Sequence, residues 1–191
     1  KTTISWNFYL TQAQREENAS YIWQVMEPQG WTIHAVSGML GNMQSESSIN
    51  PGIWQNLDDT NPDLGYGLVQ WTPSTKYTSW CAERGIDPSD MDSAILRINW
   101  ELENNQQYYP TTQYPLTFAE FKTSTRSPYY LAGAFLYNYE RPQTPNPTLR
   151  GQQANAWYQY LTGETPPTPT PGGKPYIPKP MKFIYYLKRR F

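Results

Sequence analysis

The sequence predicts an α+β fold that is mainly helical, with one small β-hairpin set between helices. First, apolar residues recur at helical spacing in several segments, for example Val36, Met39, Leu40 and Met43. Second, serine and threonine residues stand at the expected starts of these segments, where their side chains can cap a helix. Third, residues 52–72 are instead rich in glycine, asparagine, aspartate and proline and end in a short apolar run, which indicates a loop followed by a strand.

Length and composition limit the possible functions. A chain of 191 residues forms one domain, or one domain with an extension. Its eight tryptophans and sixteen tyrosines suit both a core and a groove in which rings stack on sugars. The net charge of −1 gives no bulk attraction to nucleic acid or to an anionic membrane, so neither is an expected partner. No run of eighteen apolar residues is present, so we expect no transmembrane segment.

Cysteine and histidine are too few for several common sites. The lone Cys81 excludes an internal disulfide framework, and the lone His34 makes a His/Cys metal site improbable. Zinc-binding motifs, nucleophile elbows and phosphate-binding glycine loops are missing from the sequence. We therefore expect neither a metal nor another cofactor. The first residues do not form a signal peptide, and because the chain lacks an initial methionine we expect it to be processed or part of a longer protein.

The first two helices are indicated by their caps. Thr11 is a suitable N-cap for a helix through about residue 28, and Thr32 for a second helix. The second helix should end between residues 47 and 51, because Asn50 precedes a proline and proline disfavours the α region in the residue before it.

The middle and the second half of the chain supply the remaining elements. Residues 58–63 are predicted as a loop, and Tyr66 to Trp71 as a strand of the hairpin. Further helices are predicted over residues 73–85 and from a cap at Asp87 or Ser89 to about residue 102. A short helix should follow the capping-box residue Thr117. The last two helices are predicted from Ser127 to about residue 139 and over residues 148–161.

The predicted domain organisation has three parts. Residues 1–162 form the folded body, and residues 163–180 form a proline-rich, extended linker. Residues 181–191 are aromatic and basic and too short to fold alone. We expect this segment to add to a partner chain, for example as a strand.

Glu46 is the leading candidate for chemistry. It follows Met39 by seven residues and Met43 by three, so it continues the apolar stripe of the second helix. Burial there would favour the protonated form of a carboxyl, which a general acid needs near neutral pH. On spacing alone, a solvated glutamate in a fraying last turn is an equal alternative.

Glycoside cleavage also needs a second group that stabilises or attacks the developing carbocation. The available carboxylates in the following loop are Asp58, Asp59 and Asp63. None is distinguished by spacing, and each also fits a loop-capping or solvated role.

Three blocks, in order, resemble one known family. They are GMLGNMQSESSINP at 38–51, GYGLVQW at 65–71 and AFLYNYERP at 134–142. The first is similar to the glycine-rich helix end of the lysozyme superfamily, and the ordered set most resembles the phage tail lysozyme family, the peptidoglycan-degrading domain of tail-knob proteins. The resemblance covers roughly residues 15–162.

This resemblance implies a lysozyme-like fold, with the hairpin lining a cleft. It implies cleavage of the β-1,4 bond between N-acetylmuramic acid and N-acetylglucosamine, with Glu46 as catalytic acid. It further implies that five residues lie in the cleft: Tyr66, Gln70, Tyr139, Trp54 and Trp71. The two tryptophans could stack on sugars, although Trp71 could equally belong to the core. Glu140 is expected to pair with Arg141 or with a neighbouring helix rather than to act in catalysis.

Three functions remain open at this point. The first is a lysozyme in the virion, at a tail tip or knob, that opens the host wall for DNA entry and contacts other tail proteins through residues 181–191. The second is a lytic transglycosylase on the same fold, which needs no second carboxylate because a substrate hydroxyl attacks. The third is a glycan-binding or structural tail module without catalysis, since fold alone does not decide function.

Overall fold

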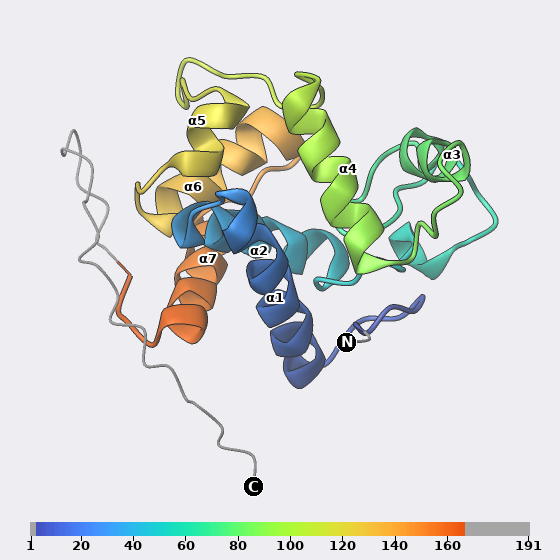
Figure 1. Cartoon of the computed structure of the whole chain (residues 1–191), viewed down its shortest axis with the longest axis horizontal. Helices are drawn as coiled ribbons and strands as arrows, with labels where there is room; N and C mark the ends of the chain where they lie inside the picture. The colour runs from blue at the N-terminus through green and yellow to red at the C-terminus, as the bar shows by residue number, and fades with distance from the viewer. Residues whose placement is uncertain (1–2, 167–191) are drawn as a thin grey trace, which may run out of the picture.

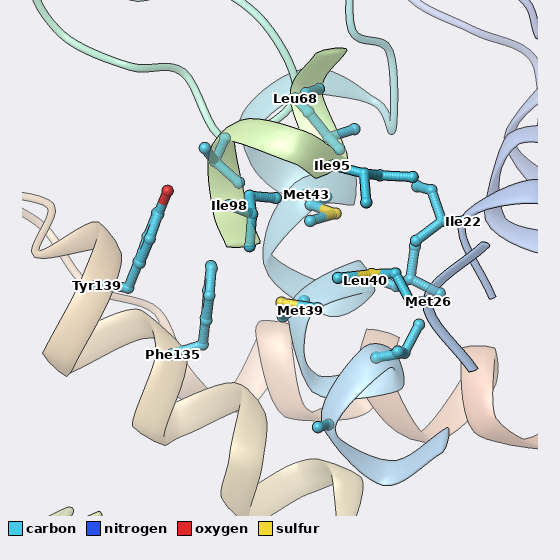
Figure 2. Packing of buried hydrophobic residues seen from close by; sticks show 14 of the residues in the cluster. Ile22, Met26, Met39, Leu40, Met43, Leu68, Ile95, Ile98, Phe135 and Tyr139 are labelled. Carbon is cyan, nitrogen blue, oxygen red and sulfur yellow. The ribbon is translucent and has the colours of Figure 1, made fainter. Parts of the chain in front are cut away.

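The fold is built around α2 (Ile33–Ser47), a helix that is buried along most of its length. The computed structural model describes residues 3–166, and Figure 1 shows most of the other helices arranged around α2. Thr32 caps α2 by accepting a hydrogen bond from the Ala35 amide at 3.1 Å, as predicted. The apolar core surrounds its middle turns. Figure 2 shows Met39, Leu40 and Met43 facing Ile22 and Met26, Ile95 and Ile98, Leu68, Phe135 and Tyr139.

Helices account for nearly all the regular structure in this part of the chain. α1 (Gln12–Met26) and the 3₁₀ turn η1 (Glu27–Gln29) precede α2, and the 3₁₀ turn η2 (Gln55–Leu57) and α3 (Thr75–Ala82) follow it. The second half holds α4 (Met91–Glu103), α5 (Phe118–Thr123), α6 (Pro128–Phe135), the π-helical turn η3 (Leu136–Glu140) and α7 (Pro147–Thr162). The prediction of a mainly helical fold is therefore confirmed.

Two glycines let neighbouring helices approach α2 closely. A Cβ atom on Gly38 would lie 2.9 Å from the Leu131 Cβ of α6. A Cβ atom on Gly41 would meet the Arg150 carbonyl oxygen and lie 2.8 Å from the Ala154 amide nitrogen of α7. Backbone contact at this range requires glycine, so the spacing of these glycines fixes how α6 and α7 pack on α2.

The predicted hairpin is wrong. Within residues 3–166 the structure has no extended strand, only isolated antiparallel bridges between Trp54 and Tyr66 and between Tyr66 and Trp71. The amides of Tyr66 and Trp71 each donate to the other residue's carbonyl, at 3.2 and 3.1 Å. Between them the chain makes a tight turn with positive φ at Gly67 and Gln70. The apolar run therefore forms a tight turn that packs on the core, and it does not form the repeated backbone pairing of a β-hairpin.

Several helix ends also differ from prediction. α4 is capped by Asp90, because the Asp87 carboxylate instead accepts from the amide and hydroxyl of Ser89. α3 begins at Thr75, and α7 is capped by Asn146. The helix predicted to reach residue 139 changes to π geometry after Phe135. The caps at Thr11, Thr117 and Ser127 are confirmed.

The predictions for the linker beyond residue 166 and for the 181–191 segment concern residues outside the described part of the chain. Among the helices of the described part, none is long and apolar enough to cross a membrane.

Candidate functional site

Glu46 lies in the last turn of α2, with about one-fifth of its side chain exposed. The helix end that carries it is held firmly. The Ser47 hydroxyl donates to the carbonyls of Met43 and Leu68, at 3.0 and 2.7 Å. The Asn50 amide donates to the carbonyl of Phe8 at 2.7 Å. Glu46 is thus on a fixed helix end rather than in a fraying turn.

Arg150 of α7 is the direct partner of Glu46. Its Nη2 donates to Glu46 Oε1 at 2.6 Å, and its Nη1 donates to the Asn42 carbonyl at 2.9 Å. The Arg150 side chain is only about 10% exposed. The guanidinium is therefore fixed to α2 at two points four residues apart by charge-assisted hydrogen bonds.

Glu140, in the π-helical turn η3, brings a second carboxyl to the same cluster. Its Oε1 atom is buried and has no hydrogen-bond partner. Burial, followed by the charge of Glu46, raises the pKa of Glu140 well above its ordinary value, and Arg150 opposes this shift. The expected pairing with Arg141 is not present, since Arg141 Nη1 donates to the carbonyls of Gln107 and Asn138, both at 2.6 Å.

A third carboxyl, Glu101 of α4, is the centre of a buried network. It accepts from Trp71 Nε1 and Arg97 Nε, each at 2.9 Å, and from the Tyr139 hydroxyl. Burial raises the pKa of Glu101, while the hydrogen bond from Tyr139 and the charge of Arg97 lower it. This network ties the turn at 66–71 to α4 and η3, so it sets the position of the η3 turn that carries Glu140.

Most of the expected sugar-contacting rings are placed in the core. Tyr66, Trp71 and Tyr139 are 5%, 3% and 1% exposed, so they present no open ring face. Trp71 stacks on Tyr77 with ring centroids 4.1 Å apart, in agreement with its alternative assignment to the core. Trp54 is partly exposed and packs against the Tyr66 ring at 4.7 Å. Of these four rings, Trp54 is the one with an exposed part that could meet a ligand.

Gln70 has a structural task in the described structure. Its side-chain amide donates to the carbonyls of Ile53 and Gly67, at 3.1 and 3.0 Å. These bonds hold the turn in which Gln70 itself has a φ of 51°.

The described hydrogen bonds do not connect the three loop aspartates to Glu46 or to Arg150. Asp58 accepts from the hydroxyl and amide of Thr60, at 2.6 and 3.0 Å, and these bonds lower the pKa of Asp58. Asp59 and Asp63 are exposed. Nor does the described part of the chain contain a cluster of three or more His, Cys, Asp or Glu side chains suited to a metal ion.

Comparison with known proteins places this arrangement in a family. Residues 17–161 match the family model of the phage tail lysozyme. The chain belongs to the phage tail lysozyme family. Over 158 residues it is 51% identical to Morphogenesis protein 1 of Bacillus phage B103, a match that covers 83% of this chain and 43% of that protein. The chain thus spans less than half the length of this relative.

The phage tail lysozyme region therefore contains the whole charged cluster, and sequence reasoning identified only part of it. Arg150 follows the same helix face as Ala154 and Trp157, at spacings of four and seven. Glu101 similarly continues the stripe of Ala94 and Ile98. A charged residue within an apolar stripe needs a buried partner. That signal could have marked both residues, although it could not have identified their partners.

Proposed function

We propose that this chain is a muramidase-type peptidoglycan glycosidase in which Glu46 is the general acid. The bond cleaved is the β-1,4 linkage between N-acetylmuramic acid and N-acetylglucosamine in the glycan strand. The observation that carries the proposal is the cluster at the end of α2, where a partly exposed Glu46 is fixed by Arg150 beside the buried Glu140. Membership of the phage tail lysozyme family supports it.

The chemistry needs one carboxyl that protonates the leaving oxygen and a second group that stabilises or attacks the anomeric carbon. Glu46 is exposed enough to reach a substrate yet held rigidly, which a general acid requires because its proton must lie within hydrogen-bond reach. Trp54 is the partly exposed ring nearest in sequence after Glu46, and we propose that it contacts a sugar face.

In biological terms, we propose that the chain acts in a virion, at the tail, and locally opens the host cell wall for genome entry. A phage morphogenesis protein among its relatives supports this location. The aromatic and basic residues 181–191 are proposed to contact other tail proteins.

One observation favours a lytic transglycosylase as the second candidate. The Asp58 carboxylate is already bonded to Thr60 within its own loop, while Asp59 and Asp63 are exposed. A transglycosylase does not need a loop carboxylate, because the substrate's own hydroxyl attacks. Mass spectrometry of the released fragments separates the two reactions, since hydrolysis leaves reducing ends and transglycosylation leaves 1,6-anhydro ends.

The deciding experiment is digestion of purified peptidoglycan by the chain and by Glu46→Gln. We expect the substitution to lower the rate about 10²- to 10⁴-fold, the usual contribution of general acid catalysis. Glu103→Gln, at an exposed position of α4, is the matched control and should digest normally. Equal rates for the chain and Glu46→Gln would remove Glu46 from the mechanism, and binding without digestion by the unsubstituted chain would favour a glycan-binding module.

A further inference from the structure

A groove of about 380 Å³ opens at the surface where residues of α1, α2 and α7 meet. Figure 1 shows these three helices together. The residues that line the groove carry no charge, and most of them are glutamines or aromatic residues: Gln12, Gln44, Gln152, Gln153, Trp157 and Tyr160. A glutamine amide both donates and accepts hydrogen bonds, so this lining suits a neutral ligand that is rich in polar groups.

Two of the glutamine amides are oriented by bonds to neighbouring side chains. The Trp157 Nε1 donates to Gln44 Oε1 at 2.9 Å, and the Ser45 hydroxyl donates to Gln153 Oε1 at 2.7 Å. Each amide oxygen is therefore already engaged with the protein. The NH₂ groups of Gln44 and Gln153 are left to donate to a ligand or to water.

Tyr160 gives the groove a fixed aromatic surface. Its ring meets Trp157 edge to face, with ring centroids 5.7 Å apart and an interplanar angle of 89°. Its hydroxyl lies 3.4 Å from the Ser20 hydroxyl of α1. Tyr160 is nevertheless 46% exposed, so part of its ring is open to a ligand. An open ring beside amide donors matches a pyranose sugar, whose C–H face is apolar and whose substituents form hydrogen bonds.

The groove is continuous with the proposed site at Glu46. Along the interface between α2 and α7, Glu46 contacts Arg150, Ser45 contacts Gln153 and Gln44 contacts Trp157. The last two of these contacts belong to residues of the groove. The groove therefore begins next to the ion pair of Glu46, where sugars that flank the cleaved bond can reach it.

We propose that this groove binds an N-acetylglucosamine residue of the peptidoglycan strand. The Tyr160 ring would pack on the sugar face, and the amides of Gln44 and Gln153 would donate to its hydroxyl and acetamido oxygens. N-acetylglucosamine carries no charge, in agreement with the uncharged lining. The choice of this glycan rests on the proposed function, whereas binding in the groove does not require catalysis by Glu46.

The first test is NMR titration of the Glu46→Gln chain, which keeps the probe from being cleaved by the proposed acid. The probe is the soluble β-1,4-linked tetramer of N-acetylglucosamine. We expect the side-chain NH₂ signals of Gln44 and Gln153 and the indole signal of Trp157 to shift together, with one dissociation constant. Shifts confined to other residues, such as Trp54, or no shift at millimolar tetramer, would overturn the proposal.

The second test is cosedimentation with insoluble peptidoglycan, again in the Glu46→Gln background. Tyr160→Ala and Gln153→Ala should each weaken binding about three- to tenfold, the loss expected for one modest contact. Tyr160→Phe keeps the ring and should bind nearly as well as tyrosine. Leu96→Ala, at a residue of α4 that is 51% exposed, is the control and should bind normally. Unchanged binding by both alanine variants would refute the role of the groove.

Failure of this inference is distinguishable from failure of the proposed function. Digestion of peptidoglycan by the unsubstituted chain, without shifts at the groove signals, would refute the groove and leave the glycosidase. Shifts at the groove in a chain that digests nothing would refute the glycosidase and leave the sugar-binding groove. Thermal unfolding of each variant confirms that a loss of binding occurs in a folded protein.

Discussion

Replacing Gly41 with alanine tests whether the close contact between α2 and α7 determines stability. In an ordinary helix interior this change stabilises by about 0.5–1 kcal/mol, because glycine loses more backbone freedom on folding than alanine. Here the new methyl group would meet the Arg150 carbonyl oxygen and lie 2.8 Å from the Ala154 amide nitrogen. Both are backbone atoms, so neither can turn aside as the end of a flexible side chain would.

The expected result is therefore a net loss of stability, opposite in sign to the helix propensity. Overpacking of a filled core costs about 1–3 kcal/mol, and the rigid contacts here indicate the upper part of that range. After subtracting the gain in propensity, we expect a net loss of about 2 kcal/mol. For a chain of this size, that corresponds to a fall in Tm of about 4–8 °C.

Thermal unfolding followed by circular dichroism at constant pH measures this difference. Gln152→Ala, on the exposed face of α7, is the control and should change stability by no more than about 0.5 kcal/mol. If Gly41→Ala unfolds at the same temperature as the original chain, or higher, the helices are not held at backbone contact and the reasoning fails.

Three further changes give equally definite results. His34 is 3% exposed, and desolvation lowers its pKa to about 4, below the ordinary value of 6.5. The unfolded chain therefore binds a proton at His34 more readily than the folded chain does. The contribution of His34 to the free energy of unfolding is constant above pH 6.5 and falls by up to about 3 kcal/mol as the pH drops towards 4. Chemical denaturation of His34→Gln should lack this component of the pH dependence, and an identical dependence would contradict it. Trp71→Phe removes one donor to Glu101 and should cost about 1–3 kcal/mol by the same measurement, whereas a neutral result would mean that the buried carboxyl does not need that donor. Thr117→Ala removes the hydroxyl that accepts from the Glu120 amide, one of the two bonds of the α5 capping box, and should cost about 1 kcal/mol, while Thr123→Ala at the other end of α5 should cost less.

The helices could be predicted because their signals are local. Thr11, Thr32, Thr117 and Ser127 each accept from the amide three residues ahead, so the cap depends on nearby sequence alone. The prediction of a hairpin was wrong because the apolar run from Tyr66 to Trp71 also fits a tight turn, in which only these two end residues pair. The bonds from the Gln70 side chain to Ile53 and Gly67 select that turn, and sequence spacing does not reveal them.

The site could be predicted only in part for a related reason. Glu46 continues an apolar stripe, so its helix and face follow from periodicity. Arg150 lies 104 residues away, and its contact with Glu46 depends on how α7 crosses α2 at Gly41. Glu140 is the last residue of the π-helical turn η3, whose geometry shifts its direction relative to an α-helix, so the pattern of the preceding helix did not place it in the cluster.

The burial of α2 has a consequence for motion. Side chains from Ala35 to Met43 are all buried, so their amide hydrogens should exchange with solvent only when the whole domain opens. The residue proposed as the acid stands three positions beyond this slowly exchanging segment, at the point where the helix first meets solvent. Local fluctuation in the surrounding loops would thus move the contacts proposed for a glycan more than the helix end that carries the proposed acid.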